Sequence, residues 1–166
     1  DRLAYYLNAY NAFVLAAVRD HCPITNVQEF YAGGGFFWRI SFWMGGEPIT
    51  LTDLQSQKIR SVMQSNPAIH FARVGAAKGF LPLRPEAYVS DRLKDQLNEV
   101  VESALKSEEM AKRVGDELHL SEIFDWYKSD FVKPEDWVKR HAPALVSDKV
   151  KVTFMPFDWR LNGACP

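Results

Sequence analysis

Apolar side chains occupy almost every position from Leu3 to Arg19, on all sides of the helix that this stretch would form. A helix without a polar face is normally buried, so the stretch predicts a helix inside a core. Asn8 and Asn11 interrupt the apolar sequence, and Asn11 falls on the same helical line as Leu7 and Val14. Because a buried amide needs hydrogen-bond partners, we expect both side chains to fix segments that lie nearby.

Short apolar or alternating runs, bounded by glycine and other turn residues, predict the strands. One antiparallel sheet is expected to contain three of them: Phe36–Trp43, Ile49–Leu51 and Val150–Phe154, the last of which alternates with Lys149, Lys151 and Thr153. The apolar run Ala68–Val74 is expected to be a short strand or a buried turn.

Capping residues predict further helices, which are expected to follow Thr52, Ser90 and Ser121. Thr52 with Gln55 matches a capping box, and Pro134 suits the first turn of another helix. Because strand and helix patterns do not alternate regularly, a doubly wound parallel sheet is not expected. The predicted fold class is α+β: a small antiparallel sheet packed with a buried N-terminal helix and several further helices.

Chain length and net charge limit the number of domains and the classes of partner that the chain can have. The 166 residues suit one domain, 1–166, and no linker divides them. With 20 basic and 21 acidic residues, a net charge of -1 and no dense run of Lys or Arg, the chain has no electrostatic signature for nucleic acid. No apolar run reaches the roughly 18 residues of a membrane-spanning segment.

The chain opens without Met, inside a predicted helix, so we expect a trimmed sequence. An export signal removed from it would make the protein periplasmic or secreted, but the compartment stays open.

Two cysteines, Cys22 and Cys165, lie near opposite ends of the chain. Two readings are equally supported: one disulfide closing a long loop, which implies an oxidising compartment, or two free thiols. Their spacing matches no metal motif, so no metal is expected. Neither cysteine is expected to be catalytic.

A few polar residues stand where the local sequence favours burial. His70 follows Ile69 in an apolar run, where a satisfied core histidine is the commoner case and a general base the alternative. Arg84, between Leu83 and a proline, favours a structural ion pair over a ligand contact. Asp158, after the last predicted strand, is the natural partner of Arg84 or His70, although a turn role is equally supported.

The sequence lacks the common motifs for nucleophilic catalysis and for phosphate or dinucleotide binding. Lys78, in the loop 75–85, is most simply a solvated side chain. No nucleophile elbow occurs, and Gly33-Gly34-Gly35 has neither the lysine of a phosphate loop nor dinucleotide-binding spacing. No cofactor is therefore predicted.

Five stretches, taken in order, resemble the domain of unknown function 547 (DUF547) family, which is found in bacteria and plants. The family patterns are W-x-N-x-Y-N-A, S-L-x-D-I-E-H-x-I-L-R, H-F-A-L-x-C-G-x-K-S-C-P-P-L-R, L-S-x-I-F-x-W-Y and Y-D-W-x-L-N. The matching residues are 6–12, 49–54 with 59–60, 69–72 with Lys78 and 82–84, 120–127 and 157–162. The resemblance covers nearly the whole chain and brings no agreed activity with it.

The chain departs from the family at reactive positions. Gln55-Ser56 stands where the family has Glu-His, and Gly75 and Phe80 stand where it has two cysteines. The loss of both thiols argues against thiol catalysis. The polar residues that still match the family are Asn11, His70, Lys78, Arg84, Asp158 and Asn162.

Two functions are compatible with this polar set. The favoured one is a module that binds a small molecule or peptide in a polar cleft, without a thiol nucleophile. The alternative is a hydrolase- or transferase-like enzyme with His70 as base, Asp158 as its orienter and Asn11 as a polar stabiliser. In either case Lys78, Arg84 and Asn162 are the expected ligand-binding residues.

The matching residues also predict a geometry. At least three of Asn11, His70, Arg84 and Asp158 are expected in one polar cluster beside the loop 75–82, with Arg84 and Asp158 as an ion pair. The oligomeric state is left open.

Overall fold

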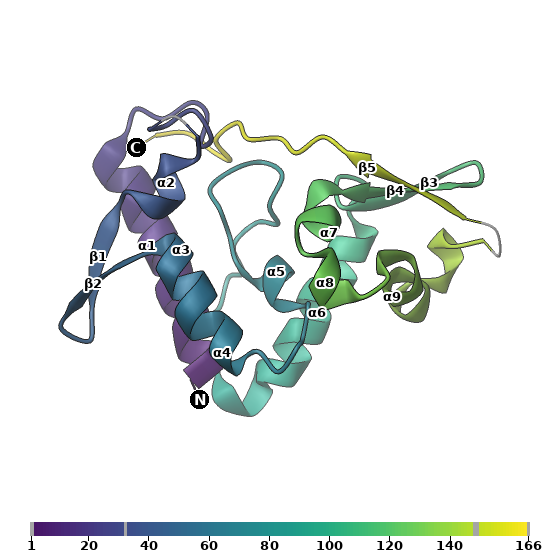
Figure 1. Cartoon of the computed structure of the whole chain (residues 1–166), viewed down its shortest axis with the longest axis horizontal. Helices are drawn as coiled ribbons and strands as arrows, with labels where there is room; N and C mark the ends of the chain where they lie inside the picture. The colour runs from purple at the N-terminus through teal and green to yellow at the C-terminus, as the bar shows by residue number, and fades with distance from the viewer. Residues whose placement is uncertain (1, 32, 148–149, 166) are drawn as a thin grey trace. The chain divides into compact units, whose positions relative to one another are not determined.

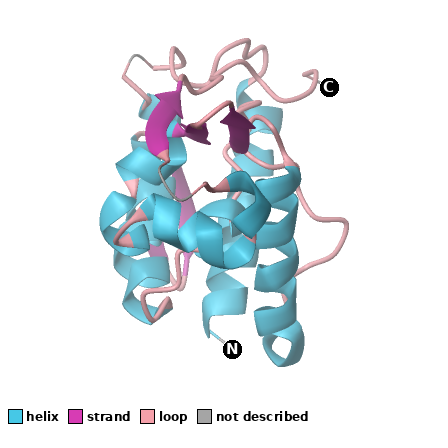
Figure 2. Cartoon of the chain, turned by 90° about the vertical axis from the view of Figure 1, so that its right-hand side faces the viewer, coloured by secondary structure: helices cyan, strands magenta, loops and turns pink. Residues whose placement is uncertain are grey.

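The computed structural model describes residues 2–31, 33–147 and 150–165. Its regular elements are mostly helical, with short strands (Figure 2), and the α+β fold class is confirmed. Figure 1 labels the helices and strands. The helices are α1 (Arg2–His21), α2 (Gly35–Trp38), α3 (Leu51–Asp53), α4 (Arg60–Val62), α5 (Ile69–Ala72), α6 (Leu93–Lys106), α7 (Glu122–Trp126), α8 (Lys128–Phe131) and α9 (Pro134–His141). The strands are β1 (Ser41–Met44), β2 (Glu47–Thr50), β3 (Ala111–Val114), β4 (Glu117–Ser121) and β5 (Lys151–Met155).

The chain divides into two compact units. The first unit consists of Asp1–Ser65, Ala72–Leu93 and Asp158–Pro166, and the second of Asn66–Phe71 and Lys94–Phe157. Each unit is therefore built from separated stretches of chain. The prediction of one domain over residues 1–166 stays a prediction.

The first unit is built on α1, the buried helix that the sequence predicts. Its inward side chains include Leu7, Tyr10 and Val14, each at most 2% exposed. Burial does not extend all round the helix, however, since Tyr5 is 58% and Leu15 52% exposed. The helix therefore has an outer apolar side that the core does not cover.

The predicted strand Phe36–Trp43 is only partly a strand. Its first residues form the short helix α2, preceded by Gly34 with a φ of 80°, and only Ser41–Met44 (β1) pairs with β2 in an antiparallel hairpin. Gly45 and Gly46 turn the hairpin with φ of 66° and 88°, which glycine adopts without the steric cost of a side chain. Phe42 stacks on Phe13 of α1 at 4.4 Å between ring centroids, which anchors the hairpin to the helix.

The predicted helix after Thr52 begins two residues earlier. Thr50 is the N-cap: its hydroxyl accepts a hydrogen bond from the Asp53 amide at 3.1 Å, and the Asp53 carboxylate completes the capping box. The predicted Thr52–Gln55 box is therefore wrong. The helix then widens into a π-helical turn at Leu54–Ile59 before α4.

The second unit holds a three-stranded sheet in the order β3-β4-β5. β3 and β4 are antiparallel, whereas β5 runs parallel to β4, with Leu118 opposite Val152 (Figure 1). The prediction that 150–154 joins the same antiparallel sheet as 36–43 and 49–51 is wrong, because the strands form two sheets. Lys149, which belonged to the predicted alternation, lies outside the described residues.

Two helices of the second unit begin at the residues that the sequence predicts. The Ser121 hydroxyl accepts a hydrogen bond from the Ile123 amide at the start of α7, and Pro134 opens α9. In the first unit Ser90 is not the predicted cap: it is the first residue of a 3-10 turn, Ser90–Arg92, whose N-cap is Val89 and which leads into α6. A short helix, Pro143–Leu145, follows α9. The run Ala68–Val74 forms neither a strand nor a simple turn: residues 69–72 are the helix α5.

Aromatic rings from α5, α7, α8 and α9 form the core of the second unit. Phe124 lies 4.8 Å from Phe131, which in turn lies 5.1 Å from Trp137, between ring centroids. Phe71 of α5 lies 5.4 Å from Phe124. Large rings of this kind bury much apolar area in a core, and aromatic residues make up 13% of the sequence.

Candidate functional site

Two asparagines of α1 hold both ends of the loop that runs from Ala72 to Tyr88. Asn11 donates to the Ala72 carbonyl at 3.1 Å and accepts from the Val74 amide at 2.9 Å. Asn8 donates to the Tyr88 carbonyl and accepts from the Tyr88 amide, both at 2.8 Å. The Tyr88 hydroxyl also donates to the Ala72 carbonyl at 3.2 Å, and burial raises the pKa of Tyr88. The expectation that both amides fix nearby segments is confirmed.

The C-terminal segment of the first unit lies between this loop and the chain that follows α1. The Lys78 amide donates to the Arg160 carbonyl and the Gly79 amide to the Asp158 carbonyl, both at 2.9 Å. On the other side the Leu161 amide donates to the Thr25 carbonyl, also at 2.9 Å. These backbone bonds hold residues 158–162 as a central strip of irregular sheet.

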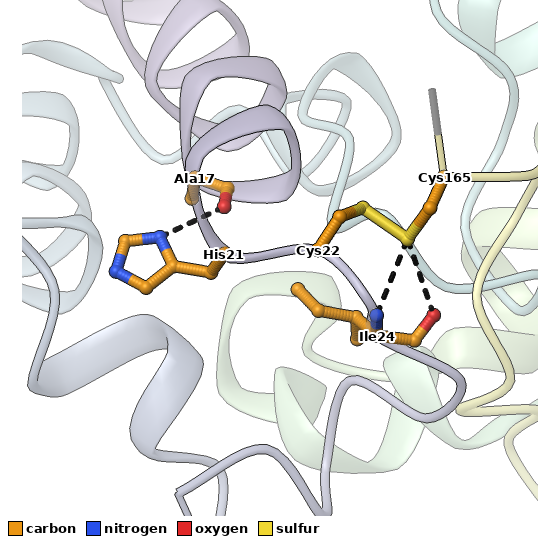
Figure 3. The surroundings of a disulfide bond; sticks show 5 residues. All are labelled: Ala17, His21, Cys22, Ile24 and Cys165. Carbon is orange, nitrogen blue, oxygen red and sulfur yellow. Dashed lines mark hydrogen bonds between the residues drawn. A yellow bond between two sulfur atoms is a disulfide. The ribbon is translucent and has the colours of Figure 1, made fainter.

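A disulfide between Cys22 and Cys165 joins this segment to the end of α1 (Figure 3). The Ile24 amide donates to the Cys165 sulfur at 3.2 Å. Of the two readings that the sequence leaves open, the disulfide is the one found, and no free cysteine occurs in the described residues. Neither cysteine is therefore available as a thiolate.

The first unit has a mainly apolar hollow of about 280 Å³, which we call the apolar hollow. Its walls come from α1 (Val14, Leu15, Val18, Arg19), the loop (Val74, Ala76, Ala77, Phe80, Leu81, Leu83) and the C-terminal segment (Leu161, Asn162, Ala164). Arg19 is engaged by Asp20 at 2.6 Å. The side-chain amide of Asn162 makes no hydrogen bond to any residue that the structure describes, so it can serve a ligand.

A second hollow of about 260 Å³ lies along the same helix; we call it the polar hollow after the polar side chains in its lining, although most of its surface is apolar. Its lining includes Asn8, Asn11, Arg84, Glu86 and Tyr88. Leu15 and Leu83 line both hollows and are about half exposed. The two hollows therefore adjoin at this shared wall beside α1, and we call the pair the α1 groove.

Arg84 does not pair with Asp158. It makes its ion pair with Glu86 at 2.8 Å, and Arg92 binds the same carboxylate at 2.9 Å. Asp158 instead pairs with Arg160, whose Nε lies 2.9 Å from its carboxylate. Hydrogen bonds from Arg160, aided by the charge of Lys78, lower the pKa of Asp158 to about 2. The predicted Arg84–Asp158 pair is wrong.

His70 finds its carboxylate within the second unit. Its Nε2 lies 2.8 Å from Asp130, and its ring stacks on Tyr127 at 3.8 Å between centroids. The side chain of His70 is fully buried and that of Asp130 is 10% exposed. Sequence reasoning missed Asp130, because a single Asp in a short helix looks like any solvated carboxylate. This arrangement fits the core-histidine interpretation.

The predicted single polar network is therefore replaced by separate arrangements. Asn11 bonds to backbone, His70 to Asp130, Arg84 to Glu86 and Asp158 to Arg160. Of the predicted site residues, Asn11 and Arg84 line the polar hollow and Asn162 lines the apolar hollow. Lys78 is exposed and lines neither hollow.

Sequence reasoning also missed Arg73, which is only 2% exposed. Its guanidinium lies 5.2 Å from the ring centre of Tyr10 and donates to Gln55 at 2.7 Å. The available signal was its place as the one cation in the apolar run Ala68–Val74.

Among the described residues, no group of three His, Cys, Asp or Glu side chains could hold a metal ion. No helix there is long and apolar enough to cross a membrane.

A family model described as "Protein of unknown function, DUF547" matches residues 1–103. The chain belongs to this family. No curated protein and no solved structure matches it. In this DUF547 protein the matched residues include α1 and the whole loop 72–88, and so two of the three walls of the apolar hollow. Asn162 and the rest of the C-terminal wall lie beyond the match.

Two positions at which this DUF547 protein departs from the family pattern lie in contact. The Phe80 ring packs directly against Gly75, so that a Cβ at residue 75 would collide with it. Gly75 is therefore required by its neighbour rather than by backbone conformation. The two departures fit one another, because the glycine leaves the space that the ring fills.

Gly75→Ala is expected to destabilise the protein by about 1–3 kcal/mol, because the methyl group forces the ring of Phe80 to move. The measurement is the free energy of unfolding in urea. Phe80→Ala removes the obstacle, so the methyl group should cost much less in Gly75→Ala/Phe80→Ala than in the wild type. Equal costs in the two backgrounds would show that the ring does not restrict residue 75.

Proposed function

We propose that this DUF547 domain is a binding module whose α1 groove takes the apolar part of a small molecule or peptide. The apolar hollow carries the proposal: it is open, its lining is mainly aliphatic and aromatic, and the Asn162 amide is available for a polar group of the ligand. Concave, mostly apolar sites with a few polar groups are typical of ligand pockets. Asparagine clamps, backbone bonds and a disulfide fix all three walls, which favours a preformed site.

Among the described residues that line this groove there is no cysteine, serine, threonine or lysine. Gly75 and Phe80 stand at the family's cysteine positions, and the chain's own cysteines are joined to each other. Binding without covalent chemistry is therefore the better-supported function. The disulfide also supports export to an oxidising compartment.

The enzyme alternative has one supporting observation, the 2.8 Å bond between His70 and Asp130. A carboxylate that holds a histidine ring is a common feature of general-base catalysis. A base must nevertheless reach the proton that it removes, and the fully buried His70 side chain offers no surface to a substrate. The structural role of His70 is therefore the stronger interpretation.

Leu15→Glu is expected to weaken binding of the neutral apolar dye Nile red by about tenfold or more, because a carboxylate on the wall that both hollows share must be desolvated by the ligand. Fluorescence titration measures the affinity. The matched control is Tyr5→Glu, an equally exposed position on α1 that lines neither hollow.

Tyr5→Glu should leave dye binding unchanged, and both variants should keep the helical circular dichroism of the parent. Failure of the parent protein to bind the dye would remove the proposed function. Equal weakening by both substitutions would place the dye outside the α1 groove.

A further inference from the structure

Asn162 and Gly163 form an exposed bend between two anchored parts of the chain. On one side the Asn162 backbone amide donates to the Ala76 carbonyl at 2.7 Å, at the end of the irregular strip 158–162. On the other side Cys165 is held by its disulfide (Figure 3). Neither the Asn162 side chain nor the Gly163 amide makes a hydrogen bond to any residue that the structure describes. Both groups are therefore accessible to each other and to water.

The backbone requires glycine after Asn162. Gly163 has a φ of 121°, which a residue with a side chain rarely adopts. No heavy atom beyond its chain neighbours lies within 4 Å of the place where its Cβ would be, so conformation rather than crowding sets the residue type. Because glycine leaves its own backbone nitrogen unshielded, the side-chain carbonyl carbon of the preceding asparagine can reach that nitrogen. An Asn-Gly pair is therefore especially prone to lose the asparagine amide.

The other asparagines that the structure describes are protected from this reaction. Those of α1 hold their side-chain amides in hydrogen bonds, and Asn66 precedes a proline, whose nitrogen carries no hydrogen. Asn26 accepts hydrogen bonds from the two amides that follow in its turn, at 2.9 and 3.2 Å. Asn98 lies inside α6, where helical hydrogen bonding holds the next amide. Asn162 is thus the one reactive site that these residues offer.

We propose that Asn162 is a site of spontaneous deamidation, which places a carboxylate in the wall of the apolar hollow. The Gly163 nitrogen loses its proton and attacks Cγ of Asn162, so that a new N–Cγ bond closes a succinimide ring. The bond from Cγ to Nδ2 breaks, and the nitrogen takes up a proton and leaves as ammonia. Water then opens the ring at either of its carbonyls, which gives aspartate or isoaspartate. The sequence of steps consumes water alone.

The new carboxylate lowers the affinity of the apolar hollow for a neutral ligand. This part of the inference rests on the proposed function, because Asn162 lines the hollow beside Leu161 and Phe80. A neutral amide can be covered by a ligand at a smaller cost than a carboxylate, which must give up more of its hydration. Since the reaction is spontaneous and cannot be reversed by water, the affinity declines as the protein ages.

Peptide mapping by mass spectrometry tests the modification itself, without any ligand. The parent protein is incubated in warm, mildly alkaline buffer, which speeds loss of the proton from the Gly163 nitrogen. We expect the peptide with Asn98 to remain unconverted when half of the peptide with Asn162 has become aspartate and isoaspartate. Asn162→Gln should stay unconverted, because its longer side chain closes a six-membered ring more slowly. Conversion of Asn162 no faster than that of Asn98 would overturn the proposal.

Titration with Nile red tests the consequence for the apolar hollow. Asn162→Asp, which reproduces one product, is expected to bind the dye about fivefold more weakly than the parent. Asn98→Asp adds the same charge at an exposed position outside both hollows and should bind like the parent. The affinity of the parent should also fall during incubation as Asn162 converts, whereas that of Asn162→Gln should stay constant.

The two measurements separate the possible failures. Equal affinities for Asn162→Asp and Asn98→Asp would break the link between deamidation and the apolar hollow, even where the peptide map shows conversion. Failure of the fresh parent to bind the dye would instead overturn the proposed function, and the peptide map would still decide whether Asn162 is the site of modification.

Discussion

Breaking the Cys22–Cys165 disulfide is expected to lower the free energy of unfolding by about 4–5 kcal/mol, the largest effect predicted for this protein. The two cysteines are 143 residues apart in sequence. The bond therefore restricts nearly the whole unfolded chain, and long closed loops are where a cross-link removes most conformational entropy. Urea unfolding with and without reductant measures the difference.

The matched control is the variant Cys22→Ser/Cys165→Ser. It should unfold at the lower urea concentration of the reduced parent, and reductant should not shift it further. The disulfide also fixes the C-terminal wall of the apolar hollow, so reduction should weaken Nile red binding in protein that is still folded. A change in stability below about 1 kcal/mol would mean that the unfolded chain is restricted by other means.

Features that depend on local sequence were predictable. The apolar stretch Leu3–Arg19 gives the helix α1, whose inner side is buried as its pattern predicts, although Tyr5 and Leu15 on its outer side are exposed. Asn8 and Asn11 hold neighbouring backbone because a buried amide leaves few other options. Ser121 caps α7 and Pro134 opens α9 for reasons contained within one helical turn.

Features that depend on pairing between distant parts of the chain could not be predicted from the sequence. The alternating pattern of β5 shows that it is a strand, but says nothing about which strand it joins. Pairing with β4 in parallel is decided by the distant packing of the second unit. At the start of α3, Thr50 and Thr52 are both good caps, and the Asp53 carboxylate, which reaches back to the Thr50 amide, decides between them.

The prediction of the candidate site was wrong for a different reason. Burial of polar residues was expected to require one shared network, yet Arg84 and Asp158 each find a partner only two residues away, in Glu86 and Arg160. A local partner needs little extra ordering of the chain, which favours it over a distant one. The partner of His70 lies 60 residues away in sequence, and no spacing rule points to it. The groove itself consists mainly of ordinary aliphatic residues, which carry no motif.

Asp130→Ala is expected to destabilise the protein by about 3 kcal/mol, because it leaves a fully buried imidazole without its carboxylate. The free energy of unfolding in urea measures the loss. Asp125→Ala is the matched control: Asp125 lies in the neighbouring helix α7 and forms an exposed 3.6 Å pair with Lys128. Such pairs contribute little, so its removal should change stability by less than about 1 kcal/mol.

Asp130→Asn separates hydrogen bonding from charge at the same position. Its amide oxygen can still accept a hydrogen bond from His70 Nε2, so a neutral histidine that donates there should make this variant markedly more stable than Asp130→Ala. A charged pair would instead make the two losses similar, because both substitutions remove the carboxylate. Asp130 lines neither hollow of the α1 groove, so folded Asp130→Asn should bind Nile red like the parent. Unchanged stability in Asp130→Ala would show that His70 does not need this partner for folding, and the interpretation of the pair as structural would then fail.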